Sequence, residues 1–155
     1  MRYRQAVEGD MRELAEMRWE FHYEDEPDSP EERRSEFVRE CESFLREGLL
    51  GGRWVVWLAE DGNEIVAHAC VHRLRPIPRP DDLDGEYGYL TNVYARPAHR
   101  NRGVGIRLMD EVVAWARGVG LDLLFVWPSE RSVPFYERAG FAADDERMML
   151  ELTEE

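Results

Sequence analysis

The most regular alternation of apolar and polar positions lies between residues 104 and 116. Apolar residues recur there at steps of four and at the neighbouring positions: Val104, Leu108, Met109, Val112, Val113 and Ala116. This spacing predicts an amphipathic helix that begins near Val104. Directly before it, residues 90–95 form a strand-like run and residues 96–105 a loop that contains two glycines. The segment therefore predicts a strand, a glycine-containing loop and a helix in succession.

Apolar and turn-forming residues predict the other elements. Strands are expected at residues 2–7, 53–60, 64–73, 86–95, 121–127 and 148–152, and the nearly all-apolar run 121–127 is typical of a buried strand. Helices are expected from Asp10 onward, from Ser29 to Gly48 and from Ser132 to Gly140. Between two strands, Asp61-Gly62-Asn63 predicts a hairpin turn. The order β-α-α-β-β-β-α-β-α-β predicts an α/β fold, a mixed sheet with helices on both faces.

Capping residues and apolar stripes define the first two helices. Asp10 with Glu13 forms a capping-box-like pair, and Ser29 with Glu32 forms another, with Pro30 in the first turn. The expected buried stripes are Met11, Leu14, Met17 and Phe21 in the first helix, and Phe37, Cys41, Phe44 and Leu45 in the second.

Composition limits the function classes. The 155 residues fit one domain, 1–155, and 43% hydrophobic residues fit a globular chain. The net charge of -13 argues against nucleic acid or an anionic membrane as the main partner. No run of eighteen apolar residues and no signal-peptide pattern occurs, so neither a membrane span nor export is expected. Cys41 and Cys70 lie in separate predicted elements, and we expect reduced thiols in a cytoplasmic protein.

The glycine loop differs in charge from the rest of the chain. Residues 96–107 contain four arginines and His99 but no Asp or Glu. A helix N-terminus offers free N–H groups and a positive dipole end to an anion. The third glycine of a Rossmann fingerprint is absent, because Leu108 stands there, and no Gly-Lys-Ser/Thr triplet occurs. Two interpretations stay open, a phosphate site and an ordinary connection with solvated arginines.

Two motifs resemble one known family. Arg100-Asn101-Arg102-Gly103-Val104-Gly105 resembles the acyl-CoA loop, R-x-x-G-x-G, of the GCN5-related N-acetyltransferases. Residues 134–141, Pro-Phe-Tyr-Glu-Arg-Ala-Gly-Phe, are similar to the Y-x-x-x-G-F ending of that family. The resemblance implies that the strands 90–95 and 121–127 splay apart around the pantetheine arm of acetyl-CoA, and that homodimers are frequent.

The resemblance also implies site residues. Acetyl-CoA would be bound by Val93, Tyr94 and Ala95 of the strand and by Arg100, Asn101, Arg102, Gly103, Val104 and Gly105 of the loop. Ser129 stands where relatives often carry Asn, at the start of the tyrosine helix, which shifts the hydrogen bonding to the pantetheine arm. A backbone N–H near Val93 would stabilise the oxyanion, and no metal is expected.

Tyr136 matches the tyrosine that protonates the leaving thiolate in the family, the alternative being a buried aromatic. The base is open between three choices. Glu86 reaches the cleft only if a bulge at Gly88 reverses the strand's alternation, since Val93 and Ala95 otherwise share a face with Tyr89 and Tyr87. The second choice is a water relay through Tyr87 or Tyr89, and the third is an amine that arrives deprotonated.

The expected function is therefore an acetyl-CoA-dependent N-acetyltransferase. A non-catalytic acyl-CoA-binding or sensing domain is the alternative, since one fold hosts both. The acceptor is a small-molecule or peptide amine. Residues 20–32 hold seven acids and no Lys or Arg, which is either an acidic rim that attracts a cationic acceptor or a solvated helix junction.

Overall fold

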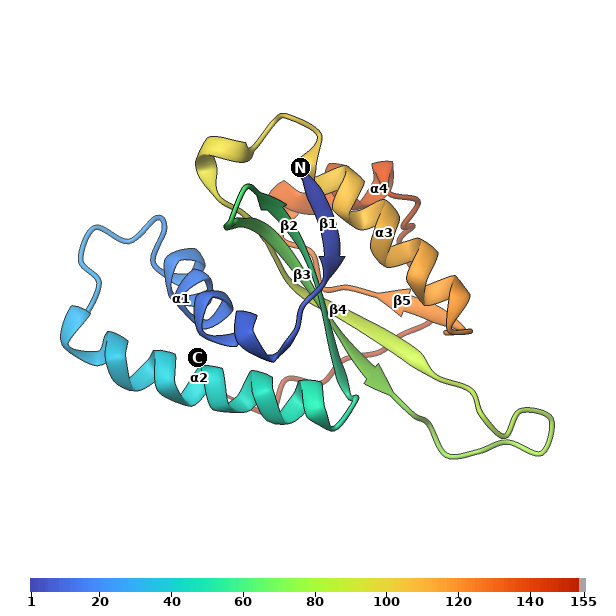
Figure 1. The fold of residues 1–155 in the computed structure, drawn as a ribbon. Helices are drawn as coiled ribbons and strands as arrows, with labels where there is room; N and C mark the ends of the chain where they lie inside the picture. The colour runs from blue at the N-terminus through green and yellow to red at the C-terminus, as the bar shows by residue number, and fades with distance from the viewer. Residues whose placement is uncertain (154–155) are drawn as a thin grey trace.

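Five strands form one mixed sheet, with helices on both of its faces, in the computed structural model, which describes residues 1–153 (Figure 1). The strands are β1 (Arg2–Gln5), β2 (Trp54–Asp61), β3 (Glu64–Leu74), β4 (Tyr87–Ala95) and β5 (Leu123–Phe125). The helices are α1 (Met11–His22), α2 (Arg34–Leu50), α3 (Val104–Gly118) and α4 (Val133–Arg138). The strand order is β1-β2-β3-β4-β5, antiparallel except for the parallel pair β4 and β5. The predicted mixed sheet is thus confirmed.

Each face of the sheet has its own apolar core. On one face, buried side chains of α3 and α4 pack on the central strands: Val104, Leu108, Met109, Val112 and Tyr136 with Val66, Val71 and Leu90. On the other face, α1 and α2 contribute Met11, Leu14, Met17 and Leu45 against Val56, Leu58 and Ile65. The apolar stripes of α1 and α3 therefore bury as their periodicity predicts.

A bulge in β4 reverses its alternation of faces. His68 pairs with Tyr94 and Cys70 pairs with Thr91, so Ala69 alone on β3 faces Asn92 and Val93 on β4. Asn92 has a φ of 51°, in the left-handed region. As a result, Leu90 lies in the core under α3, whereas Tyr94 lies in the core under α1 and α2. The bulge is at Asn92 and not at Gly88, and the predicted shared face of Val93, Ala95 and Tyr89 is wrong for that reason.

Strands β4 and β5 separate soon after they meet. β5 pairs with β4 only from Tyr87 to Tyr89, so β4 has no β5 partner from Leu90 onward. β5 itself has three residues, fewer than the predicted strand 121–127, and 47% of Leu123 is exposed. β5 is the last strand of the sheet, and its outer edge is unpaired, so the expectation of a fully buried strand is wrong.

The end of the chain also differs from the prediction. Residues 148–152 form no strand, and Met148, Met149, Leu150 and Leu152 are largely exposed. A short apolar run forms a strand only where a partner edge is at hand, and here the segment pairs with none within residues 1–153. The fold therefore has five strands and not six.

Four helix ends form otherwise than their capping residues predict. The Asp10 carboxylate accepts hydrogen bonds from Arg4 and from the Val7 N–H, so it does not cap α1. No side-chain cap bond occurs at Ser29 or Ser132 either, because the 3-10 turns Glu31–Arg33 and Glu130–Ser132 precede α2 and α4. Gly48 lies inside α2, where an added Cβ would stand 2.5 Å from Trp54 Cδ1. The absence of a side chain at Gly48 thus leaves room for the Trp54 ring, and Gly48 does not end the helix.

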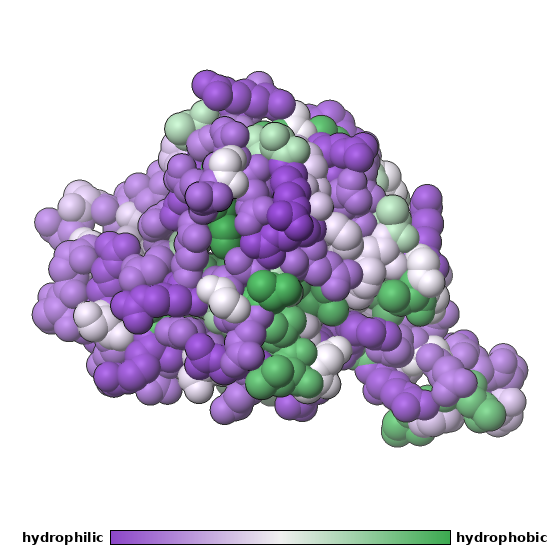
Figure 2. Space-filling model, viewed as in Figure 1, coloured by the Kyte–Doolittle hydropathy of each residue, from purple (hydrophilic) through white to green (hydrophobic). Residues whose placement is uncertain are grey.

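The surface is mostly hydrophilic on the face shown in Figure 2, in keeping with the net charge of -13. Apolar side chains stand out over the loop between β3 and β4, at the lower right, where Ile77 and Leu83 are 90% and 64% exposed. Within residues 1–153 the helices are too short or too polar to cross a bilayer.

Candidate active site

The glycine loop enters α3 through a left-handed residue. Gly103, directly before the helix, has a φ of 77°, a conformation that glycine adopts without a Cβ penalty. No other atom lies within 4 Å of the position that its Cβ would take, so the space beside the loop is open. Asn101 is also left-handed, with a φ of 59°. The first turn of α3 therefore presents backbone N–H groups to an open space, as an anion site requires.

Beside this loop lies a cavity of about 810 Å³, which we call the loop-side cavity. Of the predicted cosubstrate ligands it is lined by Val93, Tyr94, Ala95, Arg100, Asn101, Gly103, Gly105 and Ser129, together with Tyr136. Arg102 and Val104 do not line it, and Val104 is buried in the core under α3. Most of the predicted ligands are thus brought to one hollow between β4, α3 and α4.

A second cavity, of about 710 Å³, lies toward α1 and α2, and we call it the helix-side cavity. Its aromatic lining is Phe21, Phe37, Phe44, Trp54, Tyr89, Trp127 and Tyr136. Five residues line both cavities: Phe21, Val93, Ser129, Ser132 and Tyr136. The two cavities therefore adjoin at a junction where β4 and the segment after β5 diverge, and these five residues form that junction.

Tyr136 stands at this junction. Its side chain is buried, with 8% exposed, and its ring contacts those of Phe135 and Phe141 edge-on at centroid distances of 5.1 and 5.5 Å. Burial raises the pKa of its hydroxyl to about 12. The phenol is therefore protonated at neutral pH, and its hydroxyl carries a proton at the boundary of the two cavities.

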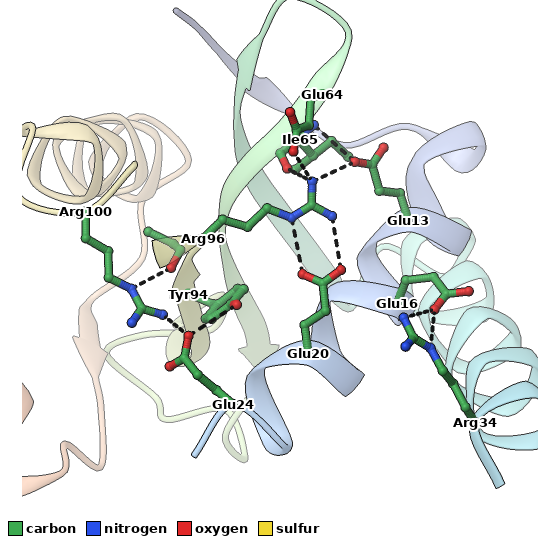
Figure 3. Close-up of polar contacts among 11 residues, drawn as sticks. Glu13, Glu16, Glu20, Glu24, Arg34, Glu64, Ile65, Tyr94, Arg96 and Arg100 are labelled. Carbon is green, nitrogen blue, oxygen red and sulfur yellow. Dashed lines mark hydrogen bonds and ion pairs between the residues drawn. The ribbon is translucent and has the colours of Figure 1, made fainter. Parts of the chain in front are cut away.

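Three of the four arginines in residues 96–107 are bound to carboxylates. Arg107 donates to Glu111 at 2.9 Å, and Figure 3 shows the other two, Arg96 and Arg100. Arg96 donates to Glu20 at 3.2 Å and to Glu64 at 2.7 Å, and Arg100 pairs with Glu24 and donates to the Ala95 carbonyl at 2.8 Å. The charges that distinguish the loop in the sequence are thus partly neutralised by α1 and by the residues after it.

The acidic stretch 20–32 is partly occupied by the same contacts, whereas Asp25, Glu26, Asp28 and Glu32 are exposed and form no ion pair within residues 1–153. Glu20 and Glu24 hold arginines of the loop, and Glu31 accepts from Ser29 and lies 3.6 Å from Arg34. Of the seven acids only Glu24 lines either cavity, and its charge is opposed by Arg100. The stretch therefore ties α1 to the glycine loop, which neither interpretation of the sequence included.

Two other arginines face the loop-side cavity and were missed by the sequence analysis. Arg131 and Arg138, at the start and end of the α4 region, line the cavity, and neither forms an ion pair within residues 1–153. The sequence could have pointed to them through their positions on either side of Tyr136, five residues before it and two after it in the chain. They supply positive charge that Arg96 and Arg100 do not.

Glu86 lies outside both cavities. The bulge at Asn92 does reverse the alternation, but Glu86 precedes the first residue of β4, and its carboxylate accepts two hydrogen bonds from Arg73, at 3.0 and 2.7 Å. Of the other candidates for proton removal, Tyr89 lines the helix-side cavity and Tyr87 lines neither. Nor does any group of three or more His, Cys, Asp or Glu side chains within the described chain suit a metal ion.

Ser129 occupies the entrance to α4 and lines both cavities. Its hydroxyl donates to Ser132 Oγ at 3.1 Å, and Ser132 Oγ donates to the Ser129 carbonyl at 2.9 Å. This closed pair of hydroxyl contacts fixes the turn that positions Tyr136 in the next turn of helix.

Comparisons with known proteins agree on one family. The model of the "Acetyltransferase (GNAT) family" matches residues 11–141. A curated glucosamine 6-phosphate N-acetyltransferase from Trypanosoma brucei brucei is 34% identical over 65 residues, 42% of this chain and 44% of its own, so the match spans under half of that relative.

Solved structures extend the likeness to the whole fold. A predicted acetyltransferase from Clostridium acetobutylicum, solved with acetyl-CoA, is 26% identical, with a TM-score of 0.78 over 97% of this chain and 96% of its own. A glucosamine-6-phosphate N-acetyltransferase from Arabidopsis thaliana, 17% identical, has a TM-score of 0.70 over 98% of both chains. An aminoglycoside acetyltransferase from an uncultured soil sample, with sisomicin, is 15% identical, with a TM-score of 0.72 over 99% of this chain and 96% of its own.

Proposed function

The chain belongs to the acetyltransferase (GNAT) family, and from this premise we propose that it transfers the acetyl group of acetyl-CoA to a primary amine. The observation that carries the proposal is the position of Tyr136, which lines both the loop-side and the helix-side cavity. Two ligands that meet at one buried donor suit direct transfer in a ternary complex.

The loop-side cavity suits acetyl-CoA. Its left-handed Gly103 and the first turn of α3 offer N–H groups to the pyrophosphate, and Arg131 and Arg138 offer charge to the phosphates. The stretch of β4 from Leu90 to Ala95 has no partner on the β5 side, which leaves room beside Val93 for the pantetheine arm. That a relative of the same fold was solved with acetyl-CoA supports this donor.

The transfer forms a bond from the amine nitrogen to the acetyl carbon and breaks the bond from that carbon to sulfur. The neutral amine nitrogen loses one proton to water, and the departing sulfur gains one through Tyr136, which regains a proton from water. Tyr136 donates a hydrogen bond to the departing sulfur, because its pKa of about 12 keeps it protonated until negative charge develops there. A thiol has a pKa of about 8.5, so the sulfur needs this donor only in the transition state.

The acceptor enters from the helix-side cavity, where Tyr89 is the candidate for relaying the amine proton through water. Relatives that act on glucosamine 6-phosphate and on an aminoglycoside support a small-molecule amine. We also propose a cytoplasmic location, which fractionation of the source cells would check. We further propose a homodimer, which a sedimentation measurement would check.

The test is release of free CoA thiol from acetyl-CoA by the purified full chain, with a pooled panel of primary amines, and mass spectrometry of the products. The proposal expects thiol release that depends on both the protein and an amine, and an acetylated amine in matching amount. Stabilisation of the fold by CoA without turnover on any amine would instead favour a non-catalytic acyl-CoA-binding domain.

A further inference from the structure

The helix-side cavity has an unusual balance of side chains for a site that would bind a sugar phosphate or a polyamine. Seven aromatic side chains line it: Phe21, Phe37, Phe44, Trp54, Tyr89, Trp127 and Tyr136. Only two of its twenty lining residues carry a charge, Arg18 and Glu40. An acceptor with many charged or hydroxyl groups would leave most of these groups without partners there, at a cost in affinity.

Ring contacts join the aromatic side chains at the cavity into two clusters. On the α2 side, Trp54 stacks on His72 at a ring distance of 4.6 Å and meets Phe44 edge-on at 5.9 Å. On the β5 side, Tyr89 stacks on Phe125 at 5.2 Å and meets Trp127 at 5.0 Å. Phe44 and Trp127 are 57% and 64% exposed, so large apolar surfaces at this cavity remain uncovered. A bound apolar group would remove that surface from water.

Arg18 gives the cavity its one cation. It lies on α1 with its guanidinium over the Phe21 ring, at 5.6 Å from the centroid, and it is partly buried. Arg34 and Arg96 nearby are paired with Glu16 and Glu20, but Arg18 forms no ion pair within residues 1–153. An unpaired guanidinium in an apolar surrounding favours a carboxylate, which it binds through two parallel hydrogen bonds.

From these aromatic clusters and the Arg18 guanidinium we propose that the acceptor is a primary amine that carries an aromatic or similarly bulky apolar group and a carboxylate. The apolar group would lie between Trp54 and Trp127, the carboxylate would bind Arg18, and the amine would point to Tyr136. This inference rests on the proposed acetyl transfer and specifies its acceptor.

The experiment compares aryl amines that differ only in the carboxylate. L-phenylalanine and 4-(2-aminoethyl)benzoate carry it at two different distances from the amine, and phenethylamine lacks it. Glucosamine 6-phosphate and spermidine represent the other acceptor classes. For at least one carboxylated aryl amine we expect a kcat/KM about tenfold or more above that of phenethylamine, on the scale of one charge-assisted pair. Phenethylamine should in turn exceed the sugar phosphate and the polyamine.

Two variants separate charge from apolar contact. Arg18→Met should abolish the preference for the carboxylated amine and leave phenethylamine within about twofold, because the aliphatic stem is kept. Trp127→Ala should lower kcat/KM for both amines. Arg39→Met is the matched control: Arg39 lies on α2, is exposed, forms no ion pair within residues 1–153 and lines neither cavity.

The outcomes distinguish this inference from the proposed function. Transfer to glucosamine 6-phosphate or spermidine in preference to every aryl amine would overturn the proposed acceptor class but leave acetyl transfer itself supported. A preference for the carboxylated amine that is unchanged in Arg18→Met would have the same consequence. If no amine is acetylated, the proposed function fails, and calorimetry with N-acetyl-L-phenylalanine in the presence of CoA decides the inference. Binding that Arg18→Met weakens about tenfold or more supports it, and no binding contradicts it.

Discussion

Arg100, the first residue of the loop motif, is paired with Glu24 just beyond the end of α1, seventy-six positions earlier in the chain. The pair joins the glycine loop to the helix that borders the helix-side cavity (Figure 3). The Glu24 carboxylate also neutralises the Arg100 charge, which the sequence motif assigns to the phosphates of the ligand in the loop-side cavity.

Glu24→Gln should therefore strengthen the binding of CoA. The neutral amide frees the Arg100 charge, and at low ionic strength we expect the Kd to fall by roughly two- to fivefold, with less effect in high salt. Calorimetry at two salt concentrations measures this. Glu26→Gln, an exposed acid of the same stretch, is the control and should change little. Weaker binding in Glu24→Gln would show that the pair positions the loop more than it opposes the ligand's charge.

Arg131 and Arg138 supply the free charge of the loop-side cavity. Replacing either by Gln should raise the Kd for CoA by roughly three- to tenfold at low salt and reduce its dependence on ionic strength. Arg117→Gln is a matched control, since Arg117 is exposed near the end of α3 and lines neither cavity. Equal affinities for all three variants would mean that the phosphates lie elsewhere.

Gly48 connects helix packing with acceptor binding. In Gly48→Ala the new Cβ would meet Trp54 Cδ1 at 2.5 Å, so the indole must move from its stack on His72. We expect a loss of about 1–3 kcal/mol in the free energy of unfolding and a raised KM for the amine, with the Kd for CoA unchanged. Gly118→Ala, where nothing lies within 4 Å of the new Cβ, should be neutral or slightly stabilising. An unaltered amine KM in a destabilised Gly48→Ala would remove Trp54 from the acceptor site.

His68 should make stability depend on pH. It is fully buried on β3, opposite Tyr94, and burial lowers its pKa from 6.5 to about 4, so the folded protein keeps it neutral. Between those values the unfolded chain binds the additional proton, so the free energy of unfolding falls as the pH drops from 6.5 toward 4, by up to ~1.4 kcal/mol per unit.

Denaturant titrations of the wild type and of His68→Leu at several pH values between 4.5 and 7.5 isolate this contribution from that of the carboxylates. The difference in stability between the two proteins should shift in favour of the variant as the pH falls. A constant difference across this range would mean that His68 is protonated in neither state or in both.

Local patterns predicted the parts of the site that depend on neighbours in the chain. The periodicity from Val104 to Ala116 places α3, and the glycines before it give the loop, because helix entry and left-handed turns are decided within a few residues. Contacts between distant segments could not be obtained in this way. Nothing near Arg100 in the sequence indicates Glu24, and nothing near Gly48 indicates the Trp54 ring.

The alternation of residues along β4 predicted wrongly which side chains share a face of the sheet. One additional residue at Asn92 exchanges the faces of everything before it, and so places Tyr89 in the helix-side cavity. Glu86 reaches neither cavity even after this exchange, because its carboxylate pairs with Arg73. The apolar positions Phe37 and Phe44 of α2 were assigned to the core, yet they line a cavity, because a core stripe and a binding wall have the same helical spacing.

The central claim is that Tyr136 serves acetyl transfer at the meeting point of two ligands, and Tyr136→Phe tests it most directly. The variant keeps the ring that packs on Phe135 and Phe141 and removes only the hydroxyl. In single-turnover measurements with acetyl-CoA and an active amine, the account predicts a rate lower by about a hundredfold or more, with the Kd for CoA within about twofold of the wild type. A wild-type rate in the folded variant would contradict it.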